Sequence, residues 1–205
     1  MSKFLITCWH YPGHLYPQIA IATALRSRGH EVAIYSGDLA KPVVESEGFQ
    51  FFPFRRLSEE SVNETLLGLD RFNSDPKSGL DFTKLMRDFM IKTIPDQMAD
   101  LDPILDEFRP DVVVTDQTMW APIFVIAAQG KYPVAISSCG AFCLIPGRDV
   151  PPFGLGLGPA HNPAQWLLHR VINAAKEVIG RNFRNTLNAT LRSFSLPPVL
   201  SLIHI

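Results

Sequence analysis

The sequence predicts an α/β fold: a Rossmann-like, doubly wound parallel sheet with helices on both faces. Two observations lead to this prediction. Short apolar runs rich in β-branched residues alternate with stretches of helical length, which is the pattern of consecutive strand–helix–strand units. The runs are apolar along almost their whole length, as in strands that are covered on both faces. The crossovers between such strands are expected to be right-handed.

The first predicted unit carries the most informative residues. Lys3–Cys8 is a short apolar run and reads as a strand. A turn containing Pro12 and Gly13 follows and presents His14. We expect a helix from about Pro17 to Arg28, because proline suits the first turn of a helix.

The next elements continue the alternation. His30–Ser36 is predicted as a second strand, Leu39–Glu47 as a helix and Phe49–Phe54 as a third strand. Pro53 indicates that this third strand ends there or lies at the edge of the sheet, because proline has no backbone N–H to donate. Residues 55–78 are more polar and less regular, and we expect them to form an excursion over the sheet.

The second half of the predicted sheet begins after a long helical stretch. Leu80–Phe108 is predicted to be helical, with breaks at Pro95 and near Pro103. Asp111–Asp116 is a β-branched run that ends in a carboxylate, and it is predicted as the fourth strand.

The remaining residues predict two helices and one strand. Met119–Gln129 is predicted as a helix that ends at Gly130, and Pro133–Ser137 as the fifth strand. Residues 139–159 are rich in Gly and Pro and predict a long loop. Pro163 to about Phe194 is predicted to be helical.

Composition excludes several classes of protein. The 205 residues contain 19 basic and 20 acidic side chains, a net charge of -1, which does not favour nucleic-acid binding. No apolar run reaches the roughly 18 residues of a membrane span, and no signal peptide is recognisable, so we expect a cytoplasmic protein. Cys139 and Cys143 have no second Cys/His pair at ligand spacing, so we expect no metal.

His14 and Asp116 are the candidate catalytic residues. Each follows or ends a predicted parallel strand, so both are expected at the edge where such sheets bind ligands. A histidine with a carboxylate behind it can act as a general base. Position alone gives about even weight to a second interpretation, in which Asp116 only caps the following helix. No Gly-x-Ser-x-Gly turn and no Gly-x-Gly-x-x-Gly loop is present, which speaks against a hydrolase triad and a dinucleotide cofactor.

Aromatic and histidine side chains near the same strand ends suggest an apolar pocket. Each of them alone is better explained by ordinary core packing, and only together do they favour an acceptor site. The residues that we assign to acceptor binding are Trp9, His10, Tyr11, Tyr16, Trp120 and Phe142.

Four segments resemble a known enzyme family. They are Gly13-His14-x-x-Pro17, Arg28-Gly-His-Glu-Val32, Pro110-Asp-Val-Val-Val-Thr-Asp116 and Pro151-Pro-Phe-Gly-Leu-Gly-Leu157. The chain is similar to the N-terminal half of the UDP-glycosyltransferase superfamily with the two-domain GT-B fold. The resemblance is greatest to bacterial and fungal enzymes that act on macrolides, sterols and other lipophilic acceptors.

The resemblance implies a mechanism and a set of partners. His14 would take the proton from an acceptor hydroxyl, Asp116 would orient His14, and Gly13 would lie close to the donor. The acceptor oxygen would displace a nucleoside diphosphate, with UDP expected, and invert the configuration of the sugar. No metal and no cofactor is expected besides the nucleotide sugar as co-substrate.

The resemblance also implies that a domain is missing. Members of the family are about twice this length, and we expect residues 1–198 to be the acceptor domain and residues 199–205 a tail of non-native character. The nucleotide sugar would then be held by an absent C-terminal domain, and this chain alone would be inactive. The alternatives are a non-catalytic GT-B-like binding module that works beside a donor-binding partner and, more distantly, an unrelated α/β enzyme.

Overall fold

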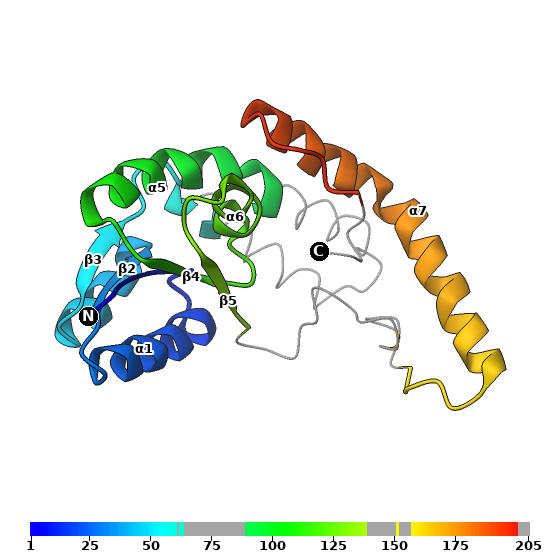
Figure 1. The fold of residues 1–205 in the computed structure, drawn as a ribbon, viewed down its shortest axis with the longest axis horizontal. Coiled ribbons are helices and arrows are strands. Elements are labelled where there is room, and N and C mark those ends of the chain that lie inside the picture. The colour runs from blue at the N-terminus through cyan, green and yellow to red at the C-terminus, as the bar shows by residue number, and fades with distance from the viewer. Residues whose placement is uncertain (61, 64–88, 139–150, 152–156, 201–205) are drawn as a thin grey trace. The chain divides into compact units, whose positions relative to one another are not determined.

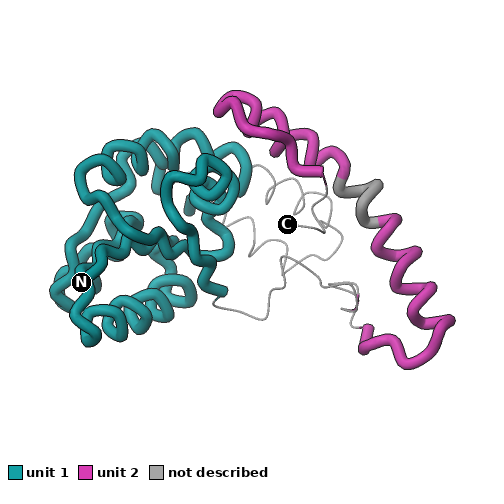
Figure 2. The backbone as a smooth tube through the Cα atoms, viewed as in Figure 1, with its two compact units in different colours: residues 1–139 teal, residues 140–205 magenta. Residues whose placement is uncertain are grey.

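The computed structural model describes residues 1–60, 62–63, 89–138, 151 and 157–200. The chain divides into two compact units, residues 1–139 and residues 140–205 (Figure 2). All five strands belong to the first unit. The assignment of residues 1–198 to one domain stays a prediction, and residues 201–205 of the proposed tail lie outside the described residues.

The strands form one parallel sheet, as the sequence predicts (Figure 1). The order across the sheet is β3-β2-β1-β4-β5. The strands are β1 (Lys3–Thr7), β2 (Glu31–Ser36), β3 (Gln50–Pro53), β4 (Val112–Asp116) and β5 (Val134–Ser137). Each lies within one residue or so of its predicted bounds, because a continuous apolar run marks both ends of a buried strand.

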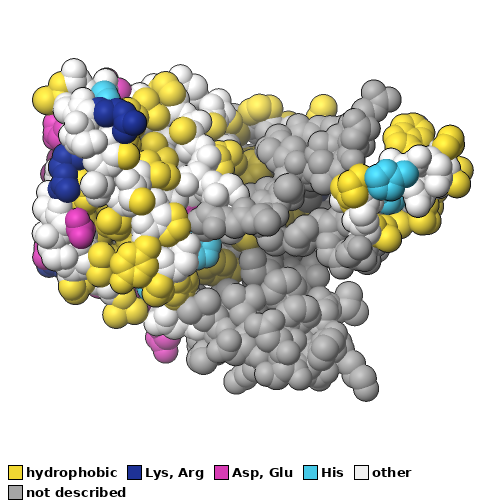
Figure 3. All heavy atoms as spheres, turned by 90° about the horizontal axis from the view of Figure 1, so that it is seen from below, with side chains coloured by type: hydrophobic (Ala, Val, Ile, Leu, Met, Phe, Trp, Pro, Cys, Tyr) yellow, Lys and Arg dark blue, Asp and Glu magenta, His cyan; other side chains and the backbone are white. Residues whose placement is uncertain are grey.

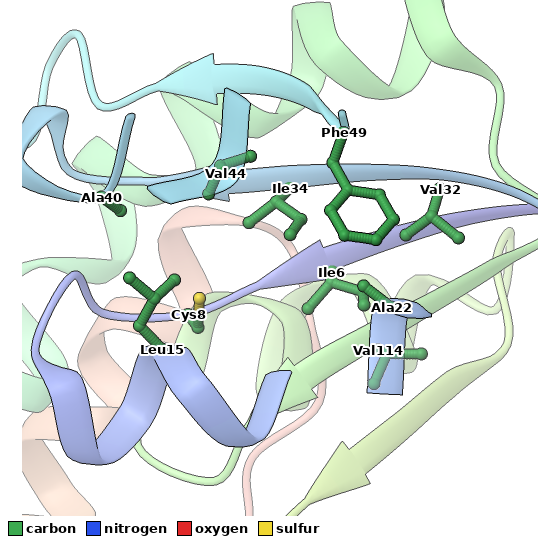
Figure 4. Packing of buried hydrophobic residues seen from close by; sticks show 10 residues of the cluster. All are labelled: Ile6, Cys8, Leu15, Ala22, Val32, Ile34, Ala40, Val44, Phe49 and Val114. Atoms are coloured by element: carbon green, nitrogen blue, oxygen red, sulfur yellow. The ribbon is translucent and has the colours of Figure 1, made fainter. Parts of the chain in front are cut away.

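One face of the sheet packs against helix α1 (Pro12–Arg26) and the short helix α2 (Lys41–Ser46), which follows the 3-10 turn η1 (Asp38–Ala40). Side chains from both helices meet those of three strands in a hydrophobic cluster (Figure 4). Its buried members are Ile6, Cys8, Leu15, Ala22, Val32, Ile34, Ala40, Val44, Phe49 and Val114. The cluster fixes the position of α1 under β1 and β4.

The other face packs against helix α5 (Ile94–Phe108). The ring of Phe108 contacts Phe52 of β3, with 6.0 Å between centroids. The carboxylate of Asp100 is buried and accepts hydrogen bonds from the Tyr35 hydroxyl (3.0 Å) and from the backbone N–H groups of residues 55 and 56 (2.8 Å each). Helices on both faces confirm the doubly wound fold.

The proline signals in the α5 region are confirmed only in part. Residues 89–92 are helical, a turn follows at Thr93, and Pro95 lies in the first turn of α5, which agrees with the predicted break. The break near Pro103 is wrong, because α5 continues through that residue. Pro103 has no N–H to donate to the carbonyl oxygen of Ala99. Both residues lie on the exposed side of α5, so water can donate to that oxygen instead.

The predicted helix between β4 and β5 is present as the π-helical turn η3 (Pro122–Ile126) and the short α6 (Ala127–Gln129). It ends at Gly130, which has a φ of 67°, as the glycine in the sequence predicts.

The second unit contains one long helix, α7 (Pro163–Ser193), close to its predicted bounds. The side chain of Asn162 caps it by accepting a hydrogen bond from the backbone N–H of Gln165 (2.9 Å). In the described parts of the chain, none of the helices has the length and apolar character that a membrane crossing requires. The cytoplasmic location stays a prediction.

Charge on the described surface of the first unit is mixed. In the view of Figure 3, basic and acidic side chains lie among apolar ones over this unit. Individual ion pairs, such as Lys3 with Glu31 at 3.2 Å, join opposite charges on neighbouring strands. This pattern is what the near-balanced composition predicts.

Candidate active site

Helix α1 begins earlier than the sequence predicts, and this changes how His14 is held. Its first residue is Pro12, and the carbonyl oxygen of Tyr11 accepts hydrogen bonds from the N–H groups of His14 (2.9 Å) and Leu15 (2.8 Å). The prediction of a turn followed by a helix from Pro17 is therefore wrong. Both prolines fit a first turn, and the Tyr11 bonds select the earlier one. His14 is thus held in helical geometry.

The strand order places the candidate site at the point where the sheet changes direction. From β1 the chain adds β2 and β3 on one side and then returns to add β4 on the other. Ligands bind at the carboxyl ends of the two strands that flank such a point. Here those strands are β1 and β4, paired as far as Thr7 and Thr115, whose buried hydroxyls bond at 2.8 Å.

His14 and Asp116 meet at this point. The Nδ1 atom of His14 lies 2.8 Å from Oδ2 of Asp116. The Asp116 side chain is fully buried, whereas 30% of the His14 side chain is exposed. Burial raises the pKa of Asp116, but hydrogen bonds from His14 and Thr118 outweigh that effect and hold its pKa below the ordinary value. Asp116 is therefore ionised at neutral pH.

An ionised carboxylate fixes the tautomer of the neighbouring ring. Since it can only accept hydrogen bonds, Nδ1 of His14 must carry the proton and donate it. The lone pair of the neutral ring is then on Nε2, which is the atom able to accept a proton from a substrate. This geometry is the one that a general base needs, with the ring oriented by a buried charge, and the catalytic role of His14 stays a prediction.

The second oxygen of Asp116 holds the turn after β4. Oδ1 accepts hydrogen bonds from the backbone N–H of Thr118 (2.8 Å) and from its hydroxyl. Capping alone is therefore not the whole role of Asp116, because one oxygen stabilises the turn while the other contacts His14. Thr118 is not among the residues that the sequence singles out, although an Asp at a strand end commonly bonds the backbone N–H two residues on.

Three of the predicted acceptor residues, Trp9, His10 and Trp120, are buried, and one is not described. Trp9 is 1% exposed, and its ring contacts Phe54 and Phe89. Trp120 is 5% exposed and packs against the ring of a neighbour on the same helical segment. Phe142 lies outside the described residues. The core-packing interpretation therefore fits Trp9 and Trp120, and their contact with an acceptor stays a prediction.

The remaining acceptor candidates, Tyr11 and Tyr16, lie just before and within the first turns of α1. Tyr11 is half-buried, its ring lies 4.4 Å from that of His10 and 6.4 Å from that of His14, and its hydroxyl donates to the carbonyl of Val62. Burial, with a contribution from Glu59, raises the pKa of Tyr11 to about 12. Tyr16 is 57% exposed, on the first turns of α1.

His10 is a buried polar side chain beside this group. Burial lowers its pKa, although the nearby Glu59 carboxylate and Asn63 act in the opposite direction. Its Nδ1 atom lies 2.2 Å from the position that a Cβ on Gly37 would take, so only glycine fits there. His10 lies before the start of α1, whereas His14 lies in its first turn.

Gly13 lies in the first turn of α1, where a Cβ would meet no atom within 4 Å. A ligand could therefore approach its backbone closely, but its place near the donor stays a prediction. Within the described residues, no group of three His, Cys, Asp or Glu side chains could hold a metal ion. The expectation that the reaction needs no metal or cofactor also stays a prediction.

Comparison with curated proteins finds two glycosyltransferases. The chain is 31% identical over 204 residues to 4'-demethylrebeccamycin synthase of Lentzea aerocolonigenes, covering 97% of this chain and 47% of that protein. It is 28% identical over 160 residues to UDP-N-acetylglucosamine--N-acetylmuramyl-(pentapeptide) pyrophosphoryl-undecaprenol N-acetylglucosamine transferase of Halothermothrix orenii, covering 74% of this chain and 36% of that protein. The chain thus spans less than half the length of either relative. No family model matches it.

Solved structures with the same fold agree with these relatives. The glycotransferase of kitacinnamycin superposes on 97% of this chain and 42% of its own, with a TM-score of 0.59 and 15% identity. That identity supports the fold alone. Of these proteins, the rebeccamycin synthase and the kitacinnamycin glycotransferase are antibiotic glycosyltransferases, and the matched fold is one half of the GT-B architecture.

Proposed function

Given that this chain belongs to the glycosyltransferases of GT-B type, we propose that it is the acceptor-binding half of an inverting enzyme. The enzyme would move a hexose from a nucleotide sugar to a hydroxyl group of a lipophilic small molecule. The observation that carries this proposal is the contact of His14 with the buried, ionised Asp116 at the strand reversal.

The proposed reaction follows from the orientation of His14. Nε2 accepts the proton of the acceptor hydroxyl while that oxygen bonds to the anomeric carbon of the sugar. The bond from this carbon to the diphosphate oxygen breaks, and its electron pair leaves with the nucleoside diphosphate. The developing imidazolium is stabilised by Asp116, 2.8 Å away. Attack opposite the leaving group inverts the configuration.

The substrate classes follow from the relatives and from the surroundings of His14. One relative is named for a natural product, rebeccamycin, and the other for a UDP-linked sugar. The ring of Tyr11 lies 6.4 Å from that of His14, and Tyr16 is an exposed aromatic side chain on the same helix, α1. We therefore propose a flat, apolar natural product as the acceptor and a UDP-sugar as the donor.

Transfer is tested in a chimera. This chain is joined to the part of the rebeccamycin-synthase relative that it does not cover, and a panel of aglycones is offered with UDP- and TDP-sugars. We expect a glycosylated product with inverted configuration, detected by mass spectrometry and by the anomeric coupling in NMR. His14→Ala should abolish transfer while aglycone binding to this chain, measured by calorimetry, is retained.

Full transfer activity in the His14→Ala chimera would refute the proposed mechanism. Aglycone binding to this chain without transfer in any chimera would instead favour the non-catalytic binding module. The positive control replaces this chain in the chimera with the matching half of the relative, joined through the same junction. Its activity shows that the junction and the donor half are functional.

A further inference from the structure

Building on the proposed function, we propose that Thr118 and Trp9 are positioning residues that orient the carboxylate of Asp116 toward His14. They form a chain of hydrogen bonds that begins at a fixed indole ring and ends at the base. Both would act through Asp116, which for the buried Trp9 is an alternative to the acceptor contact that the sequence predicts.

The chain of hydrogen bonds is continuous. Nε1 of Trp9 donates to Oγ1 of Thr118 at 3.0 Å, and Oγ1 donates to Oδ1 of Asp116. The backbone N–H of Thr118 donates to the same carboxylate oxygen at 2.8 Å. Oδ2 contacts His14 at 2.8 Å. Thr118 therefore holds one oxygen of the carboxylate and leaves the other directed at the imidazole.

The direction of every bond in this chain is set by residue chemistry. An indole N–H can only donate, and an ionised carboxylate can only accept. Because Oδ1 of Asp116 has no proton, the single proton of the Thr118 hydroxyl must lie on the bond to Asp116, and the hydroxyl oxygen accepts from Trp9. A chain of bonds with one fixed direction is polarised along its length, which strengthens each bond. An isolated threonine hydroxyl could rotate to another acceptor.

Trp9 is suited to be the fixed end. Its ring is 1% exposed and is held by the rings of Phe54 (5.8 Å) and Phe89 (4.6 Å). It follows β1, whereas Thr118 follows β4, so their bond joins the two strands at the site. The contact of His14 with Asp116 joins the same two segments a second time. Two such links fix the carboxylate in position and in rotation.

The first test follows the indole N–H signal of Trp9 in ¹H–¹⁵N spectra of this chain at neutral pH. We expect Asp116→Asn to shift that signal through Thr118, to which the indole N–H donates, and we expect no shift from the same change in a Thr118→Val background. Thr118→Val should speed exchange of the indole proton at least about tenfold, since its acceptor is gone. Thr118→Ser should restore both properties.

Thr7→Val is the matched control, because its buried hydroxyl bonds across the same two strands to Thr115 and not to the carboxylate. It should leave the Trp9 signal and its exchange unchanged. Trp166, whose ring stacks with Arg170, is the internal reference in each spectrum. If Asp116→Asn does not move the Trp9 signal, or moves it equally in the Thr118→Val background, the proposal is overturned.

The second test is kinetic and uses the chimera. Thr118→Val should lower kcat about tenfold, the equivalent of one hydrogen bond, with KM unchanged, and Thr118→Ser should retain activity. Wild-type kcat in Thr118→Val would overturn the positioning role even if His14 proved essential. A further outcome is that Asp116→Asn shifts the Trp9 signal as expected while His14→Ala keeps full transfer. In that case the proposed function fails, but the row of hydrogen bonds from Trp9 to Asp116 is still supported. Trp9→Phe, which keeps the aromatic packing, replaces Thr118→Val if that variant does not fold.

Discussion

Replacing Asp116 with Asn removes the buried charge behind His14 and leaves the shape of the side chain. The amide oxygen can still accept from the backbone N–H of Thr118, so the turn after β4 should persist. The amide nitrogen then faces Nδ1 of His14, which must become an acceptor. The ring proton moves to Nε2, so the tautomer that can accept a proton from the acceptor hydroxyl is lost.

The size of the effect follows from the geometry. Two unit charges about 4 Å apart interact by about 4 kcal/mol at an effective dielectric constant near 20, which corresponds to about 1,000-fold in rate. The ring of His14 is 30% exposed, so solvent screens part of this interaction. We expect Asp116→Asn to lower kcat about 100-fold at neutral pH with little change in KM for the acceptor.

The assay measures initial rates of transfer in the chimera with saturating donor. Asp111→Asn is the matched control, because Asp111 lies at the opposite end of β4, where its carboxylate accepts from the backbone N–H of Lys3 at 2.7 Å. That variant should keep at least half of the wild-type rate. A kcat for Asp116→Asn within threefold of wild type would refute the assignment of a proton-transfer role to this pair.

Three further outcomes are expected, all read from urea denaturation of this chain. Because the pKa of Asp116 is held below its ordinary value of 3.8 in the folded state, its contribution to stability is present above that pH and is lost as the pH falls through the folded pKa. The wild-type advantage over Asp116→Asn should thus be present above about pH 4 and vanish in stronger acid; an advantage that persists in stronger acid would contradict this. Gly37→Ala should cost about 1–3 kcal/mol, since its Cβ would lie 2.2 Å from His10, whereas Gly13→Ala should keep or raise stability by up to about 1 kcal/mol; equal effects would contradict the packing argument. Asp100→Ala should cost about 2–4 kcal/mol by leaving three donors without their acceptor, and a cost below about 0.5 kcal/mol would show that water replaces the carboxylate.

Sheet architecture could be predicted because its signals are local. A run such as Val112–Asp116 is apolar and β-branched to its last residues, so it indicates a covered strand and also marks where that strand ends. Gly130 ends a helix with a positive φ that glycine adopts without strain. The meeting of His14 and Asp116 could be predicted too, since parallel strands bring their carboxyl ends to one edge.

Features that depend on a choice between equal signals could not be predicted. Pro12 and Pro17 both fit the first turn of a helix, and the bonds to the Tyr11 carbonyl decide between them. The bond between Trp9 and Thr118 joins residues 109 positions apart, and no periodicity in the sequence reports such a pair. For the same reason a buried tryptophan at a strand end cannot be told from one that lines a pocket.

The long separation of His14 and Asp116, 102 positions along the chain, has a consequence for folding. The β1–β2–β3 half of the sheet can form before β4 is available, and β1 is then an apolar edge strand whose side opposite β2 is unpaired. During synthesis this edge stays open until residues beyond 116 have emerged, because the N-terminal segment is made first. The pairing that covers this edge is also the one that joins base and carboxylate, so the site is complete only when the most aggregation-prone stage of folding has passed.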